Sequence, residues 1–158
     1  MKDGKMIAVV VPAHNERKLI AEVLRTMPSF VDRIIVVDDA SEDETSSVVE
    51  ETRDDRVVLI RHATNLGVGA AIATGYEESI RLEADVVAVM AGDNQMHPDD
   101  LEGLIRPIVT GRADYAKGDR LHHPKVKMTM PRNRRLASIV LSRLTGLAVR
   151  APHLSDSQ

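Results

Sequence analysis

The stretch MIAVVVPAHNE, residues 6–16, decides the fold class. It begins as a continuous apolar run rich in valine and ends in the polar cluster His14, Asn15 and Glu16. An uninterrupted run of this kind predicts a strand that is buried on both faces, which is typical of a parallel sheet. The polar cluster then lies at the carboxyl end of the strand, the edge at which open parallel sheets bind their ligands.

Similar runs recur and alternate with segments in which apolar residues have helical spacing. Further strands are predicted at residues 33–38, 57–60, 85–90 and 115–118. Helices are predicted at residues 16–27, 41–52, 67–82 and 98–110. The second helix is expected to begin with a capping box, because Ser41 stands three residues before Glu44. We therefore expect an α/β fold, a mostly parallel sheet with helices on both faces.

The pattern changes after residue 120. Residues 121–130 show no clear period and predict a loop. Residues 132–147 predict a helix with an apolar stripe on one side and arginines largely off it. A basic amphipathic helix of this kind either lies on a membrane interface or docks on its own domain. We favour docking.

Composition excludes several classes of protein. The 158 residues are 43% hydrophobic and 28% charged, as in a globular domain with a real core. The absence of cysteine excludes disulfides, thiolate metal sites and cysteine nucleophiles. Aromatic residues make up only 2%, too few to stack the bases of single strands, so we expect no nucleic-acid partner. No apolar run approaches the roughly 20 residues of a membrane span and no signal peptide is evident, so we expect a cytoplasmic chain.

The net charge of −3 conceals an asymmetry. Residues 117–150 contain nine lysines and arginines against one acid, a net of +8, whereas residues 1–116 carry −10. A basic segment of this strength predicts an anionic partner. The candidates are a phosphorylated substrate, an acidic membrane surface, nucleic acid, or the acidic body of the same chain.

Polar clusters follow three of the predicted strands. They are residues 12–16, residues 38–41 and residues 91–95. Because the carboxyl ends of parallel strands share one edge, we expect the three clusters to converge. The oxygen atoms of Asp93 and Gln95 suit Mg²⁺ or Mn²⁺ completed by water and substrate phosphates. Asp38 and Asp39 suit either a metal or the hydroxyl and N–H groups of a nucleoside. Taken singly, each cluster is also compatible with a helix cap or a tight turn.

Four motifs carry a resemblance to a known family. VPAHNE (residues 11–16), IIVVDDAS (34–41), NLGVG (65–69) and GDNQMHP (92–98) resemble, in this order and spacing, those of family 2 glycosyltransferases. The chain is most similar to the polyprenol-phosphate (dolichol-phosphate) mannosyl- and glucosyltransferase branch. The resemblance implies one catalytic domain with the GT-A (Rossmann-like) fold. Residues 1–120 would bind the nucleotide sugar, and residues 121–158 would form part of a truncated acceptor side.

The resemblance also implies a role for individual residues. Those expected at the nucleotide sugar are Pro12, Ala13, His14, Asn15, Glu16, Val37, Asp38, Asp39 and Gly92. Asp93 and Gln95 would hold the metal, Asp93 and Arg120 would act in catalysis, and Arg134 and Ser138 would bind the acceptor phosphate. Two positions depart from the family pattern. Ala91 replaces the usual first carboxylate of the metal motif, and His14 replaces a tyrosine.

The implied reaction is the inverting, metal-assisted transfer of a hexose to a polyprenyl phosphate. The donor would be of the GDP-mannose or UDP-glucose type, and the reaction would take place at the cytosolic membrane face through parts of the protein beyond this chain. Two alternatives remain open. One is a non-catalytic nucleotide-sugar-binding module, favoured by Ala91, and the other is a glycosyltransferase with a sugar-hydroxyl acceptor, for which His122 or His123 would be the base.

Other α/β functions fit less well. A phosphoacceptor signalling domain needs an acidic pair after its first strand, and here Asp38 and Asp39 follow the second. A nucleotidyltransferase needs a glycine-rich basic loop after strand one, where this chain has Asn15 and Glu16. A Rossmann dinucleotide site needs a third glycine where Ile72 stands.

Overall fold

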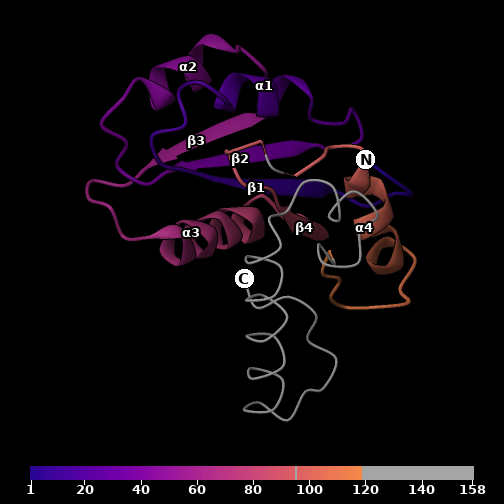
Figure 1. The fold of residues 1–158 in the computed structure, drawn as a ribbon. Helices are drawn as coiled ribbons and strands as arrows, with labels where there is room; N and C mark the ends of the chain where they lie inside the picture. Colours follow the sequence, from indigo (N-terminus) through magenta and orange to yellow (C-terminus); the bar gives the residue numbers. More distant parts are fainter. Residues whose placement is uncertain (95, 119–158) are drawn as a thin grey trace, which may run out of the picture. The chain divides into compact units, whose positions relative to one another are not determined.

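The first 118 residues form a parallel sheet flanked by helices (Figure 1). The computed structural model describes residues 1–94 and 96–118. The chain divides into two compact units, Met1–Ala116 and Lys117–Gln158, and the first contains all the helices and strands described below. In chain order these are β1 (Ile7–Ala13), α1 (Ile20–Arg25), β2 (Arg33–Asp38), α2 (Thr45–Glu51), β3 (Val57–Arg61), α3 (Val68–Arg81), β4 (Val86–Val89) and α4 (Asp100–Val109).

The strand order places a crevice beside β1. The order is β3-β2-β1-β4, and every neighbouring pair is parallel. The chain moves outward from β1 through β2 to β3 and then returns to the other side of β1 as β4. Ligands of open α/β sheets bind where the strand order reverses in this way, outside the carboxyl ends of the strands. That point lies between β1 and β4.

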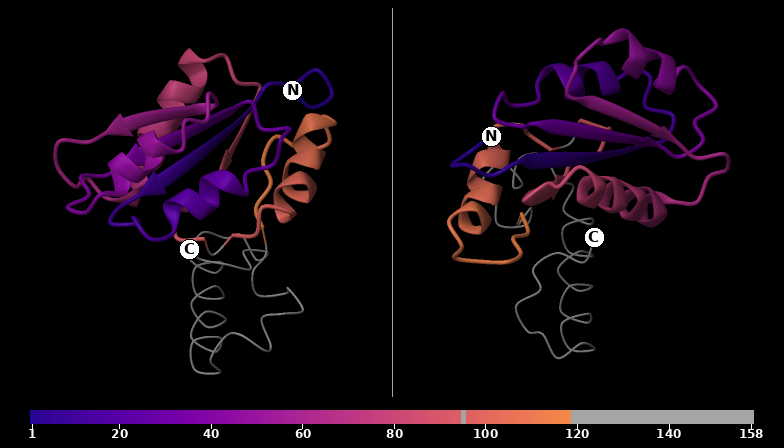
Figure 2. Two further views of the ribbon diagram at one scale, coloured as in Figure 1. Left: turned by 90° about the horizontal axis from the view of Figure 1, so that it is seen from above. Right: turned by 180° about the vertical axis from the view of Figure 1, so that it is seen from behind.

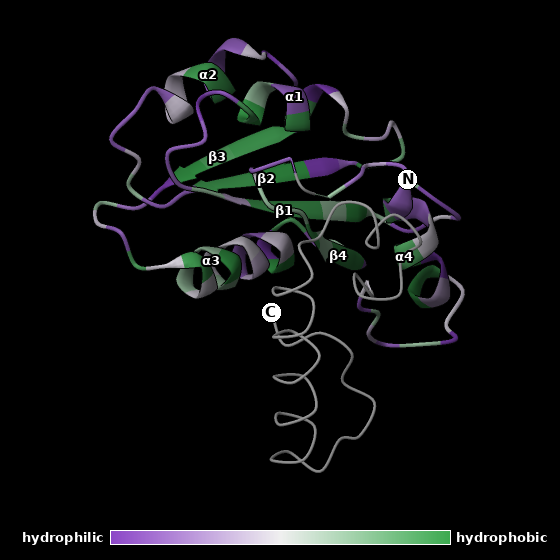
Figure 3. Cartoon of the chain, in the orientation of Figure 1, coloured by the Kyte–Doolittle hydropathy of each residue, from purple (hydrophilic) through white to green (hydrophobic). Residues whose placement is uncertain are grey.

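Helices on both faces explain why β1 is apolar throughout. All seven of its residues are buried. Figures 1 and 2 show α1 and α2 on one face of the sheet and α3 on the other. Val9 and Ile34 belong to the larger core cluster, which Leu101 of α4 also joins, whereas Ala8 and Val37 pack with Ala71 of α3. Figure 3 shows the resulting pattern, hydrophobic strands between helices whose outer faces are more polar.

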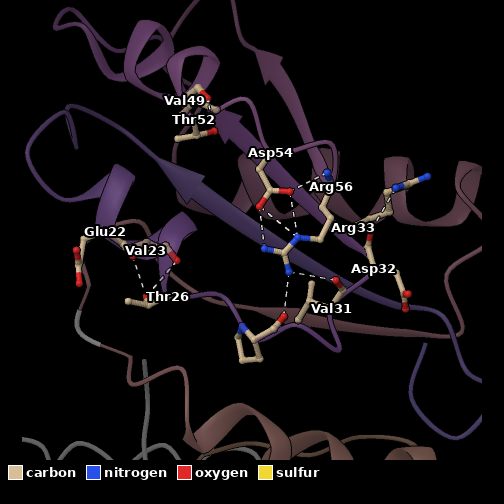
Figure 4. A network of polar contacts seen from close by, with 11 residues as sticks. Glu22, Val23, Thr26, Val31, Asp32, Arg33, Val49, Thr52, Asp54 and Arg56 are labelled. Atoms are coloured by element: carbon tan, nitrogen blue, oxygen red, sulfur yellow. Dashed lines mark hydrogen bonds and ion pairs between the residues drawn. The ribbon is translucent and has the colours of Figure 1, made fainter.

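A half-buried arginine, Arg56, lies at the amino end of the sheet, opposite to this switch point (Figure 4). Arg56 donates to Asp54 Oδ2 at 2.7 Å and to the backbone carbonyl of Pro28 at 3.0 Å. The hydrogen bond from Arg56 is the main reason why the pKa of Asp54 lies below its ordinary value. Arg56 thereby joins the turn before β3 to the connection between α1 and β2.

The strands begin and end close to their predicted positions, but two helices begin later than predicted. α1 begins at Ile20 rather than residue 16, and α2 begins at Thr45. The predicted capping box is wrong, because the Ser41 hydroxyl accepts a hydrogen bond from the Asn15 N–H instead of capping α2. Residues 115–118 are not a strand. The loop and helix predicted at residues 121–147 lie outside the described residues.

Among residues 1–94 and 96–118, no helix has both the length and the apolar composition that a membrane-spanning segment needs.

A missing side chain lets α3 press against β1. A Cβ atom placed on Gly75 would lie 2.2 Å from Val10 Cγ1, far inside van der Waals contact. Gly103 in α4 offers a matched comparison, because a Cβ there would meet no atom within 4 Å.

We expect Gly75→Ala to lower the free energy of unfolding by about 1–3 kcal/mol, since the added methyl group forces α3 away from the sheet. Gly103→Ala, the same substitution in an exposed helix position, should instead be neutral or stabilising by up to about 1 kcal/mol. Urea unfolding followed by circular dichroism measures both. Equal effects of the two substitutions would contradict the close packing of α3 on β1.

Candidate functional site

Four loops meet at the carboxyl ends of the four strands, and we call this the carboxyl edge. It comprises residues 14–19 after β1, 39–44 after β2, 62–67 after β3 and 90–94 after β4. The polar clusters that follow β1, β2 and β4 in the sequence all lie there. Neighbouring parallel strands bring their ends together in this way, as the sequence pattern predicts.

The loop after β1 is held by the hydroxyl groups of Ser41, which follows β2, and Thr45, the first residue of α2. The Asn15 N–H donates to Ser41 Oγ at 2.9 Å, and the Glu16 N–H donates to Thr45 Oγ1 at 2.9 Å. In return, Asn15 Oδ1 accepts the Glu42 N–H at 2.8 Å. Asn15 adopts a left-handed backbone with φ of +58°. These bonds keep residues 15 and 16 out of the helix and hold the two polar side chains at the edge.

Asp38 fixes the loop that follows it by accepting hydrogen bonds from two serines. Its side chain is buried, and its Oδ1 accepts the Ser41 N–H at 2.9 Å while its Oδ2 accepts the Ser46 hydroxyl. Both oxygens therefore have partners within the protein. Ala40 lies between Asp38 and Ser41 and has a left-handed φ of +57°. This turns the chain tightly enough for the Ser41 N–H to reach the Asp38 carboxylate.

Asp39 is a buried acid of the carboxyl edge that accepts three hydrogen bonds. Only 3% of the residue is exposed. Its Oδ1 accepts from His62 Nδ1 at 2.7 Å and from the Leu66 N–H at 2.9 Å, and its Oδ2 accepts the Gly67 N–H at 2.7 Å. Burial alone would raise the pKa of Asp39, but the bonds from Leu66, His62 and Gly67 lower it below its ordinary value. The carboxylate is therefore ionised at neutral pH.

The exposed imidazole of His14 is oriented by its neighbours. Its Nδ1 lies 2.9 Å from the carbonyl oxygen of Asp39. A carbonyl only accepts hydrogen bonds, so Nδ1 carries a hydrogen. The side-chain amides of Asn15 and Asn65 lie 3.1 Å and 3.3 Å from Nε2. The loops after β1, β2 and β3 therefore meet around this ring.

The loop after β4 comes close to β1 because Gly92 has no side chain. The Gly92 N–H donates to the Pro12 carbonyl at 3.1 Å, and a Cβ on Gly92 would lie 3.3 Å from Ala13 Cβ. This approach brings Asp93 near Glu16. The pKa of Glu16 is raised by burial first and then by the negative charges of Asp93 and Asp43. Two carboxylates from different loops thus repel each other beside the crevice.

The described residues fit a divalent cation that the substrate completes. In the described part of the chain, no three acidic or histidine side chains are grouped so that they would bind a metal by themselves. Mg²⁺, however, commonly takes only one or two protein carboxylates together with water and substrate phosphates. Asp93 and Glu16 offer hard oxygen ligands of this kind, and their mutual repulsion favours a cation nearby. Gln95 lies outside the described residues.

The structure separates the expected site residues into three groups. At the carboxyl edge lie His14, Asn15, Glu16, Asp39, Gly92 and Asp93, and Asp38 is the last residue of β2, directly beside it. Pro12, Ala13 and Val37 lie within buried strands, and the side chain of Val37 packs toward α3, so it offers no surface to a ligand. Arg120, Arg134 and Ser138 lie outside the described residues. Asn15 and Glu16 also line a surface hollow of about 480 Å³.

His62 and Asn65 are contacts that the site prediction missed. Both belong to the loop after β3, where His62 bonds to Asp39 and Asn65 lies against His14. The signal was present, because Arg61 and His62 directly follow the third apolar run and so lie at the same edge as the other clusters. That run has only four residues, so the polar residues that follow it are a weak signal.

Comparison with known proteins identifies the family. The profile of "Glycosyl transferase family 2" matches residues 8–155. The chain belongs to glycosyltransferase family 2. The resemblance of the four motifs is thereby confirmed, and so is the assignment of the chain to an enzyme family that transfers sugars.

Two curated relatives are sugar transferases that act on lipid phosphates by name. The chain is 32% identical to the UDP-N-acetylglucosamine–dolichyl-phosphate N-acetylglucosaminyltransferase of Methanococcus voltae, over 98% of this chain and 67% of the relative. It is 31% identical to the dolichol-phosphate mannosyltransferase of Pyrococcus furiosus, over 72% of this chain and 33% of the relative. The chain thus spans between a third and two thirds of the length of these two proteins.

A solved structure confirms the GT-A-like fold. Glucosyl-3-phosphoglycerate synthase from Mycobacterium tuberculosis, in complex with Mn²⁺, UDP-glucose and phosphoglyceric acid, superposes with a TM-score of 0.54 and 28% identity. The match covers 70% of this chain and 41% of that protein. That synthase binds both a divalent metal and a nucleotide sugar in its crystal.

The pKa of Glu16 reports how closely the loops after β1 and β4 approach each other. We expect Asp93→Asn to lower the pKa of Glu16 toward its ordinary value, because the substitution removes one of the negative charges that raise it. Asp99→Asn is a matched control, since Asp99 is exposed and does not contribute to the shift of Glu16. Carbon-detected NMR titration of the Glu16 carboxyl group gives the value. Identical pKa values in all three proteins would contradict the proximity of Asp93.

Proposed function

We propose that the chain is the donor-binding part of an enzyme that transfers a hexose from a nucleotide diphosphate sugar to a polyprenyl phosphate. The observation that carries the proposal is the convergence of polar loops at the carboxyl ends of the strands, where His14 contacts Asp39 and the charge of Asp93 acts on Glu16 across the switch point between β1 and β4. This arrangement provides hard oxygen ligands next to hydrogen-bonding groups, as a nucleoside diphosphate requires. The names of the two curated relatives support the lipid-phosphate acceptor.

The donor would lie across the carboxyl edge. His14 and Asp39, at the ends of β1 and β2, would contact the nucleoside, and Asp93 at the end of β4 would face the diphosphate. A divalent cation held by Asp93, with Gln95, would neutralise the charge that develops on the leaving diphosphate. Arg120 would add a fixed positive charge to the same group. Glu16, which Asp93 repels when no cation is bound, would be stabilised once the cation is present.

The acceptor needs positioning more than activation. A lipid phosphate already carries negative charge at pH 7, so no side chain has to remove a proton from it. Arg134 and Ser138, in the segment with a net charge of +8, would hold this phosphate. Attack from the side opposite to the leaving diphosphate would invert the configuration at the sugar carbon. The acceptor would reach the site at the cytosolic face of a membrane.

One observation favours a second candidate function. Ala91 occupies the position where the resemblance implies a metal-binding carboxylate, so the chain offers fewer metal ligands than the family pattern. A nucleotide-sugar-binding module without turnover would tolerate this change. A transferase with a sugar-hydroxyl acceptor is the other alternative to the lipid-phosphate acceptor. For a hydroxyl acceptor, His122 or His123 would serve as the base.

Donor binding tests the site. We expect nucleoside diphosphate to bind the chain in isothermal titration calorimetry with Mn²⁺ and to bind at least about tenfold more weakly with chelator, because a cation held by Asp93 would neutralise the diphosphate. Asp93→Ala should weaken binding by a similar factor. Asp55→Ala, an exposed aspartate next to the amino end of β3, should leave binding unchanged. Binding that is insensitive to both Mn²⁺ and Asp93 would disprove the metal-site assignment.

Turnover tests the acceptor. Full-length protein in vesicles with labelled nucleotide sugar should transfer the label to polyprenyl phosphate, and the product should have inverted anomeric configuration. Transfer to a free sugar alone would favour the hydroxyl acceptor. Donor binding without any transfer would favour the binding module.

A further inference from the structure

Asp39, which the proposed function places at the nucleoside, has little hydrogen-bonding capacity left for a ligand. An ionised carboxylate offers two acceptor positions on each oxygen. Both positions on Oδ1 are occupied, by His62 Nδ1 at 2.7 Å and the Leu66 N–H at 2.9 Å. On Oδ2 the Gly67 N–H takes one position at 2.7 Å. Counting the partners among the described residues, a single acceptor position remains, on Oδ2.

His62 holds the Asp39 carboxylate in the orientation that leaves only one acceptor position. The imidazole side chain is 9% exposed, and it is bound at both nitrogens. Nδ1 faces Asp39 Oδ1, which accepts only, so Nδ1 carries a hydrogen. Nε2 lies 3.0 Å from the Thr74 hydroxyl of α3. Because the ring is fixed between β2 and α3, the Asp39 carboxylate cannot rotate to present both oxygens to a ligand without breaking the bond from His62.

The number of free acceptor positions distinguishes nucleobases. Uracil presents one ring N–H between two carbonyl groups, so a single acceptor satisfies it. Guanine presents a ring N–H and an amino group side by side, a pair that matches two acceptor positions on a freely oriented carboxylate. At Asp39 one of the two guanine donors would be desolvated without a partner, which is unfavourable. Next to Asp39, Asn65 Oδ1 shares the Gly67 N–H, and the amide of Asn65 is a donor suited to a uracil carbonyl.

We propose that the donor is a uridine nucleotide and that His62 is the positioning residue that restricts Asp39 to a single contact with the base. The inference rests on the proposed function and names the substrate class within it. Asp39 makes the contact, and His62 acts through Asp39 without touching the ligand.

Calorimetry with two nucleotides tests the proposal. The whole chain, with Mn²⁺ present, is titrated with UDP and with GDP. We expect wild-type protein to bind UDP at least about tenfold more tightly than GDP. His62→Ala should weaken UDP binding and reduce the UDP-to-GDP affinity ratio about fivefold, because it frees one Oδ1 position and leaves the carboxylate with an acceptor position on each oxygen.

Two further variants separate positioning from folding. His62→Asn retains an N–H donor close to the position of Nδ1 and should restore most of the ratio. Thr74→Val removes only the hydroxyl that holds Nε2 and should have a smaller effect than His62→Ala. The affinity ratio is the informative quantity, because a general loss of stability would weaken the binding of both nucleotides alike.

Each outcome decides a different question. If wild-type protein binds neither nucleotide, the proposed function fails and the inference fails with it. If it binds both nucleotides equally, as a contact to the ribose would predict, or GDP more tightly, the proposed function stands and the inference is overturned. An unchanged ratio in folded His62→Ala would overturn the role of His62. If His62→Ala does not fold, the UDP-to-GDP affinity ratio of the wild-type protein still tests the uridine proposal. The same ratio in His62→Asn, compared with Thr74→Val, then tests the role of His62.

Discussion

The buried carboxylate of Asp39 joins segments that are far apart in the chain, and the carboxyl edge depends on it. It binds the side chain that follows β3 and the two backbone N–H groups before α3, while its own carbonyl orients the ring of His14. A buried charge is tolerated only with such partners. The same bonds that lower its pKa therefore also fix the loop before α3. One residue, through its carboxylate and its backbone carbonyl, thus joins three of the four loops.

The fourth loop is brought in by packing rather than by charge. Gly92 lets the end of β4 lie against β1, and Gly75 lets α3 lie against the other face of the same strand. As a consequence, Asp93 comes close enough to Glu16 to raise its pKa. The negative charge of Asp93 makes ionisation of Glu16 less favourable in the folded protein. Functional sites commonly contain such local conflicts, which a bound cation relieves.

The accuracy of sequence-based prediction differed between elements for physical reasons. β2 was predicted with the bounds that it has, because an apolar run buried on both faces is set by local composition. The starts of α1 and α2 were wrong, since the hydroxyls of Ser41 and Thr45 bond to the β1 loop instead of to their own helix. His62 was missed at the site because it follows a short strand and belongs to none of the quoted motifs.

The sequence by itself determined the α/β class, the edge that carries the polar clusters and the membership in family 2, because burial periodicity and motif order are local properties of the chain. Only the tertiary structure decided which oxygens of Asp39 remain available and that Glu16 faces Asp93. These pairs join residues more than twenty positions apart. Their contacts depend on the strand order, on left-handed turns and on missing side chains at two glycines, and no local pattern encodes that combination.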